Sequence, residues 1–80
     1  MDYDEMTDHI VKFEVGALYY ITIHGRRMLA LYLGLQKFVL QTHIFYVYSK
    51  NRSMHISNSL AIRMRAYITK VETDVTVAAR

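Results

Sequence analysis

Residues 17–33 read ALYYITIHGRRMLALYL, and this stretch decides the fold. Two runs of leucine, aromatic and β-branched residues flank the dipeptide His24-Gly25. A two-residue loop that ends in glycine is typical of a type I′ hairpin, in which both loop residues take a positive φ. We therefore predict antiparallel strands over residues 17–23 and 26–33. The predicted register pairs Ile23 with Arg26, Ile21 with Met28, Tyr19 with Ala30 and Ala17 with Tyr32.

Both faces of the predicted hairpin are apolar, so alternation alone does not choose the core face. We assign the core to the leucine-rich face, which holds Leu18, Leu29, Leu31 and Leu33. The other face is a second apolar surface that also needs a cover; it holds Tyr19, Ile21, Met28, Ala30 and Tyr32. A helix of the same chain, a second copy of the chain or stacked nucleic-acid bases would each supply that cover.

The flanking segments also favour strands and turns. Residues 10–15 alternate weakly between apolar and polar side chains and predict a first strand. Beyond the hairpin we predict a turn over residues 34–37, a long strand over 38–49 with a bend or bulge near 41–43, a polar turn over 49–53 and a short return strand over 54–57.

The segment that follows residue 57 fits two structures. Ser57 or Asn58 suits the N-cap of a helix, and residues 60, 64, 67, 68 and 71 would then share one helical face. Residues 67–77 instead alternate as they would in a strand. We favour a short helix from about residue 58 to residue 65, followed by a strand.

The chain has 80 residues and contains no cysteine, proline or tryptophan. A domain of this length buries only about 60% of the surface that its unfolded chain exposes, and no disulfide stabilises it. A second copy of the chain would add burial, so we expect a homodimer. The longest apolar tract, residues 28–34, is far shorter than the roughly 20 residues that cross a bilayer. The acidic N-terminus does not resemble a signal peptide, and we expect a soluble cytoplasmic protein.

Charge is distributed unevenly along the chain. Residues 15–71 hold eight lysines and arginines and no acidic residue, whereas residues 1–14 carry a net charge of −4 and residues 72–80 of −1. We divide the chain into an acidic arm, residues 1–9, and one basic β domain, residues 10–77. A surface without acids does not repel a phosphate backbone, so we predict binding of RNA or another polyanion. An acidic arm folded over this surface would compete with that ligand.

The same distribution argues against an enzyme. Catalysis by paired carboxylates and metal binding by carboxylates both need Asp or Glu inside the fold, and the three glycines form no phosphate-binding loop. His24, His43 and His55 with Lys50 would make a metal-independent ribonuclease only if the fold brought them together. We assign His24 to the hairpin turn and the other two histidines to strand faces, and predict no catalytic residue, cofactor or metal.

The predicted binding residues are cations at hairpin tips and on the terminal element. Long side chains at a tip reach a ligand easily, and arginine offers a planar fork for phosphate. The expected phosphate contacts are Arg26 and Arg27 at one tip, Lys50 and Arg52 at the second, and Arg63 and Arg65 on the terminal element, with Lys37 and Lys70 as additions. Strands between the tips carry tyrosines that would stack on unpaired bases or form the dimer interface: Tyr19, Tyr32, Tyr46 and Tyr48.

The segments VGALYYI (residues 15–21), LALYLG (29–34) and IFYVY (44–48) together resemble a small SH3-like β-barrel over roughly residues 13–72. The expected fold is therefore mainly β. It is either a small SH3-like antiparallel barrel or a strongly bent sheet, with one short helix near the C-terminus.

In character, this short chain without proline or cysteine is similar to the small phage-encoded RNA-binding inhibitors of ToxIN-type toxin–antitoxin systems. The resemblance implies a phage protein of the host cytoplasm that binds RNA through a basic surface and so blocks a host defence ribonuclease. Two other functions fit the same features. One is a protein-interaction module that inhibits an acidic host partner, and the other is a structural or assembly subunit driven by the apolar hairpin faces.

Overall fold

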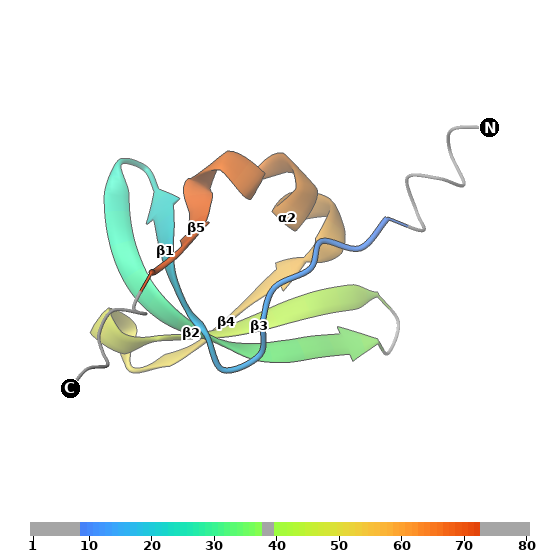
Figure 1. The fold of residues 1–80 in the computed structure, drawn as a ribbon, viewed down its shortest axis with the longest axis horizontal. Coiled ribbons are helices and arrows are strands. Elements are labelled where there is room, and N and C mark those ends of the chain that lie inside the picture. Colours follow the sequence, from blue (N-terminus) through green and yellow to red (C-terminus); the bar gives the residue numbers. More distant parts are fainter. Residues whose placement is uncertain (1–8, 38–39, 73–80) are drawn as a thin grey trace.

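Five antiparallel strands form one strongly bent sheet in the computed structural model, which describes residues 9–37 and 40–72 (Figure 1). The elements are β1 (Leu18–Ile23), β2 (Arg26–Lys37), β3 (Gln41–Val47), the 3-10 turn η1 (Tyr48–Lys50), β4 (Arg52–Ser57), α2 (Asn58–Arg63), the 3-10 turn η2 (Arg65–Tyr67) and β5 (Ile68–Lys70). The strand order β4-β3-β2-β1-β5 leaves β4 and β5 as edges, so the sheet is not closed. The mainly β prediction is confirmed in its bent-sheet form. Residues 1–8 of the predicted arm and residues 73–77 of the predicted domain lie outside the described residues.

The central hairpin has the predicted register. Tyr19 pairs with Ala30, Ile21 with Met28 and Ile23 with Arg26, and the Tyr32 N–H donates to the Ala17 carbonyl at 3.0 Å. The loop residues take the two positive φ angles that a type I′ turn requires, 52° at His24 and 75° at Gly25. The β-branched and aromatic residues of both runs suit a pleated surface, which is why the local sequence specifies these two strands.

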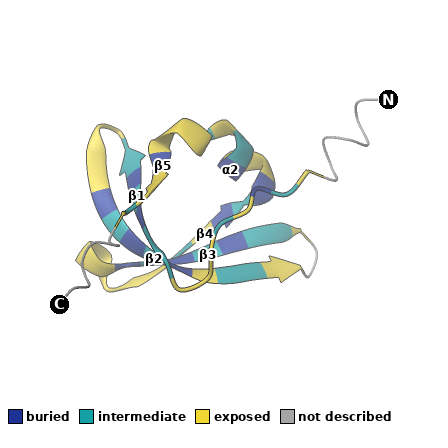
Figure 2. Cartoon of the chain, viewed as in Figure 1, coloured by how far each residue is buried: buried dark blue, intermediate teal, exposed yellow. Residues whose placement is uncertain are grey.

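The assignment of the core face, however, was wrong. Tyr19, Ile21, Met28, Ala30 and Tyr32 are buried, whereas Leu33 on the predicted core face is 46% exposed and its companions Leu18, Leu29 and Leu31 are half-buried. The sheet bends around the tyrosine-bearing face, and residues 9–14, α2 and η2 lie over that inner face (Figure 2). The cover is therefore supplied by the same chain, and the leucines lie on the outer face of the sheet.

Aromatic rings fill the inside of the bend. The ring centroid of Phe13 lies 5.3 Å from those of Tyr19 and Phe45 and 5.0 Å from that of His43, each with edge-to-face geometry. Such contacts add to the free energy of burial, because the positive edge of one ring meets the negative face of another. With its contact to Tyr32 on β2, at 5.2 Å between centroids, this one ring of Phe13 joins three strands. The segment itself forms no strand, so the strand predicted over residues 10–15 is wrong.

Strand β2 runs four residues beyond the predicted end of the hairpin. The turn predicted over residues 34–37 is therefore wrong, since the chain passes through a β-bulge between Tyr32 and Gly34 and pairs on to Lys37. Gly34 takes a φ of 139°, which other residues rarely adopt. The bulge lies on β2 and not near residues 41–43. The partner strand β3 covers residues 41–47, because Tyr48 already belongs to η1.

The prediction of a short helix after Ser57, followed by a strand, is confirmed, although the helix ends at Arg63. The helix α2 begins after Ser57, whose side-chain oxygen accepts a hydrogen bond from the Leu60 N–H at 3.2 Å. The η2 turn follows, and β5 then pairs with β1. Because α2 and η2 connect the two edge strands, they span the open side of the bent sheet. Neither described segment contains a helix of the length and apolar character needed to cross a membrane.

Candidate nucleic-acid interface

The two predicted basic hairpin tips lie at one end of the sheet. Strand β2 begins at the β1–β2 tip, and β3 ends beside it, because Ala30 pairs with Val47 in the antiparallel register. In Figure 1 the β1–β2 turn lies at the upper left and η1 at the lower left, and both are exposed in Figure 2. We call this region the basic end; it consists of Arg26, Arg27, Lys50 and Arg52, all of which are exposed. The fold thus joins cations that are separated by more than twenty positions in the sequence.

Exposed tyrosines lie beside these cations on the outer face. Tyr46 is only half-buried between the buried neighbours Phe45 and Val47, and its ring meets that of Tyr48 edge-on with centroids 5.2 Å apart. The Tyr46 hydroxyl donates a hydrogen bond to Oδ1 of Asn51, which fixes the pair on the β3–β4 turn. Tyr48 is 47% exposed, so one aromatic surface remains open to a ligand.

A third tyrosine beside these cations, Tyr20, was not among the predicted site residues. The guanidinium carbon of Arg27 lies 4.3 Å from the ring centroid of Tyr20, a cation–π contact that holds the arginine flat over the outer face. The signal was present in the predicted register, since Thr22 pairs with Arg27 and Tyr20 is the next residue on the same face.

Tyr19 and Tyr32, by contrast, are core residues and are not open to stacked bases. Their exposed fractions are 6% and 3%, and both rings pack around Phe13. The hydroxyl of Tyr19 accepts a hydrogen bond from the Glu14 N–H at 2.7 Å. Of the four tyrosines predicted for stacking or a dimer interface, the structure leaves Tyr46 and Tyr48 available.

The remaining predicted cations are exposed but lie apart from the basic end. Lys37 ends β2 at the opposite end of the sheet, and Arg63 lies on α2. Lys70 donates to the Glu14 carboxylate at 2.6 Å. That hydrogen bond and, to a smaller extent, the negative charge of Glu14 raise the pKa of Lys70. Lys70 therefore stays protonated with its charge balanced by Glu14, and Arg65 belongs to a separate groove.

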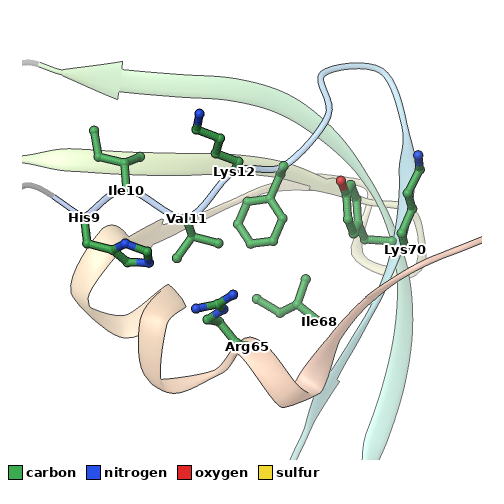
Figure 3. A pocket seen from close by; sticks show the side chains of 9 residues that line it. His9, Ile10, Val11, Lys12, Arg65, Ile68 and Lys70 are labelled. Atoms are coloured by element: carbon green, nitrogen blue, oxygen red, sulfur yellow. The ribbon is translucent and has the colours of Figure 1, made fainter.

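This groove lies between residues 9–13 on one side and η2 with β5 on the other (Figure 3). Its volume is about 810 Å³. Val11 and Ile68 contribute apolar surface, and the guanidinium group of Arg65 points into the groove toward Val11. The ammonium groups of Lys12 and Lys70 point away from it. The groove was not predictable from local sequence patterns, because its two walls come from segments more than fifty residues apart.

A buried hydrogen-bond network holds one wall of the groove in place. The side-chain amide of Asn58 donates to the His9 carbonyl at 2.6 Å, and its Oδ1 accepts from the Val11 N–H at 3.0 Å. The same Oδ1 lies 3.0 Å from Nε2 of His43, whose Nδ1 lies 2.9 Å from the Tyr32 hydroxyl. Asn58 and His43 are both buried. The position of residues 9–11 is thus fixed by the core.

The three histidines considered for catalysis do not form a site. His43 is fully buried in the network, His24 lies in the hairpin turn and His55 is exposed on β4. A substrate cannot reach a histidine with an exposed fraction of 0%. Within residues 9–37 and 40–72, no three potential metal ligands come together.

Comparison with protein-family models, with curated proteins and with solved structures gives no match for this chain. The class that the fold defines is a small, open, bent antiparallel sheet with a short helix across its open side.

Proposed function

We propose that this protein binds single-stranded RNA through the basic end and the tyrosines beside it. One observation carries the proposal: four exposed cations from two turns lie at one end of the sheet, next to Tyr20, Tyr46 and Tyr48. No acidic residue occurs between residues 15 and 71 to oppose an approaching phosphate. Cations that contact the backbone and aromatic rings that stack on bases are the two components of single-strand binding sites.

The spacing of the two turns suits a short stretch of RNA. Ala30 lies three positions after Arg27 on β2 and pairs with Val47 at the end of β3. At roughly 3.3 Å per residue, the end of β3 therefore lies about 10 Å along β2 from Arg27, and Lys50 and Arg52 follow in and after the turn beyond it. The arginines offer forked donors to phosphate, and Lys50 offers a point charge. Unpaired bases are required, because a base inside a duplex does not present its face to a tyrosine.

The test is fluorescence anisotropy with a labelled single-stranded RNA of about twelve nucleotides, comparing two double variants of equal charge. Arg26→Gln with Arg27→Gln removes half of the basic end. Lys37→Gln with Arg63→Gln removes the same charge from places that the proposed interface does not use. We expect the first variant to lose at least tenfold in affinity and the second less than threefold. Equal losses, or no binding by the unaltered protein at tens of micromolar, would overturn the proposal.

The resemblance to phage inhibitors of toxin–antitoxin systems gives the binding a proposed purpose. In that setting the bound RNA would be that of the toxin–antitoxin complex, and occupation of the RNA would block the host ribonuclease. Such an inhibitor acts by affinity alone and needs no catalytic group of its own. Inhibition of a purified toxin–antitoxin ribonuclease by the unaltered protein, but not by the Arg26→Gln, Arg27→Gln variant, is the outcome that supports this purpose.

The outer face also supports the proposal of a homodimer. Leu18 and Leu31 are cross-strand partners there, both half-buried, and Leu33 is 46% exposed. Two copies packed through these leucines would cover one another, which a small core favours. Leu31 also pairs with Tyr46, so such a dimer would use Tyr46 at its interface and leave Tyr48 and the four cations to the RNA. Light scattering at micromolar concentration should then give about twice the chain mass of 9.4 kDa. The variant Leu31→Lys should return a monomer, and a monomeric unaltered protein would contradict the dimer.

A further inference from the structure

The groove between residues 9–13 and η2 with β5 is separate from the basic end. It opens on the inner side of the bent sheet, where Tyr19 and Ile68 face the helical connection, whereas Tyr20 and Tyr46 lie on the outer face. Its volume of about 810 Å³ is within the range of small-molecule sites. The proposed RNA contacts at the two turns leave this space unused.

One part of the groove is apolar and suits a flat ring. Val11 and Ile68 line this part but are each only 8% exposed, so they belong to the core and form the floor of the groove. Phe13 is half-buried and also lines the groove. A planar heterocycle placed against these side chains would cover apolar surface that water now contacts.

A second part of the groove is cationic and is centred on one arginine. The guanidinium group of Arg65 points inward, and within the described residues it has neither a carboxylate partner nor a hydrogen bond. Lys70 on the same rim is already paired with Glu14. The groove therefore offers the donors of one guanidinium that no other described residue occupies, and these donors match the oxygens of one phosphate group.

The wall that carries Val11 is held in advance of any ligand. Asn58 bonds both to the carbonyl of His9 and to the N–H of Val11, and His43 in turn bonds to Asn58. A wall fixed in this way loses little conformational entropy when a ligand binds, so more of the contact energy contributes to affinity. This rigidity distinguishes the groove from a surface cleft between mobile side chains.

We propose that the groove binds one unstacked nucleotide, with its phosphate on Arg65 and its base against Val11, Phe13 and Ile68. The inference rests on the proposed binding of RNA and names a second site on the same ligand class. It assigns to Arg65 a role different from that of the basic end: recognition of a single nucleotide that leaves the stacked strand.

The experiment is an NMR titration of the full chain with adenosine 5′-monophosphate, with adenosine and inorganic phosphate as half-ligands. We expect the mononucleotide to shift the backbone amides of Val11, Phe13 and Ile68, and to bind more tightly than either half-ligand. Arg65→Gln should weaken binding at least tenfold, because it removes a charge-assisted hydrogen bond. The matched control Arg63→Gln, two residues away on α2 and outside the groove, should leave binding unchanged.

Three outcomes overturn the inference. Inorganic phosphate that binds as tightly as the mononucleotide would show that the apolar wall is not used. Equal losses in Arg65→Gln and Arg63→Gln would show that only net charge matters. The Arg26→Gln, Arg27→Gln variant separates this inference from the RNA proposal, since it should keep mononucleotide binding while losing single-stranded RNA. If the Arg26→Gln, Arg27→Gln variant loses RNA binding but the unaltered protein does not bind the mononucleotide, the proposed groove site is refuted and the proposed RNA binding is not.

Discussion

Asn58 and His43 share a hydrogen bond, 3.0 Å between Oδ1 and Nε2, that fixes the tautomer of a fully buried histidine. The Asn58 amide nitrogen donates to the His9 carbonyl, so its Oδ1 is the acceptor for both other partners. Nε2 of His43 must then carry the proton. In the neutral ring, Nδ1 is left to accept a hydrogen bond from the Tyr32 hydroxyl. Two strands, the helix α2 and the N-terminal segment are therefore connected by one fully satisfied polar network.

Replacing Asn58 should cost more than its small side chain suggests. Asn58→Ala leaves the Val11 N–H and the Nε2–H of His43 without partners, and each buried unsatisfied donor costs about 1–3 kcal/mol. We expect the free energy of unfolding to fall by about 3 kcal/mol in urea titrations. Ser59→Ala, on the exposed side of the same helical turn, should change it by less than about 0.5 kcal/mol. A loss below about 1 kcal/mol for Asn58→Ala would contradict the network.

Tyr32 should make the protein sensitive to alkali. Burial raises the pKa of its phenol above the ordinary 10.0, so the unfolded chain releases this proton at a lower pH than the folded one. The contribution of the buried Tyr32 phenol to the free energy of unfolding is fully present below about pH 10. It is lost as the pH rises through the pKa that Tyr32 has in the folded protein. Urea unfolding at roughly pH 8 and pH 11 should show a larger decline for the unaltered protein than for Tyr32→Phe.

One comparison and one control isolate the contribution of Tyr32. The ion pair with Glu14 raises the pKa of Lys70 as well, but it does so equally in the unaltered protein and in Tyr32→Phe. Tyr67→Phe, at a tyrosine that is 55% exposed, should decline with pH as the unaltered protein does. At pH 8, Tyr32→Phe should be less stable by about 1–3 kcal/mol, because Nδ1 of His43 loses its donor. Parallel declines in all three proteins would refute the assignment.

Gly34 should be required by backbone conformation and not by space. Its φ is 139°, and an added Cβ would meet no atom within 4 Å. Gly34→Ala should therefore cost about 1–3 kcal/mol from backbone strain alone. Gln36→Ala, at an exposed position on the same strand, is the control and should be near neutral. An unchanged free energy of unfolding for Gly34→Ala would mean that the bulge can shift or relax.

Tyr48 should contribute to RNA affinity by stacking. Tyr48→Ala is expected to weaken binding of single-stranded RNA by about 1–3 kcal/mol in anisotropy measurements, the usual range for one stacked base. Tyr67→Ala removes a tyrosine of similar exposure, 55% against 47%, from a site away from the basic end. It should leave the affinity unchanged. Similar losses of RNA affinity in both variants would show that any exposed tyrosine has this effect, and would contradict stacking at Tyr48.

The sequence predicted those parts of the fold that depend on local chemistry. The turn at His24-Gly25 and the cap at Ser57 each have a physical signature within a few residues, and both are present in the structure. The core face was not predictable in the same way. Both faces of the hairpin are apolar, and the direction of the bend depends on Phe13 and α2, which pack on it from distant segments.

In the candidate site, too, the features set by local sequence were predictable and those set by distant contacts were not. The exposed cations were predictable from charge and from their positions at tips, and antiparallel order already places alternate tips at one end. The groove was not, because Lys12 and Arg65 belong to segments more than fifty positions apart, which long-range contacts such as the Val11–Asn58 hydrogen bond and the Lys70–Glu14 ion pair bring together. The buried role of Tyr19 and Tyr32 likewise follows from the bend and not from the pattern of residues.

The salt dependence of RNA binding tests the central claim most directly. Neutralisation of Z phosphates on a single strand gives a slope of about −0.7Z for log affinity against log salt concentration, so the four cations of the basic end predict a slope of roughly −3. The Arg26→Gln, Arg27→Gln variant should give a slope of roughly −1.5. A flat response in the unaltered protein, or the same slope in both proteins, would contradict binding through the basic end.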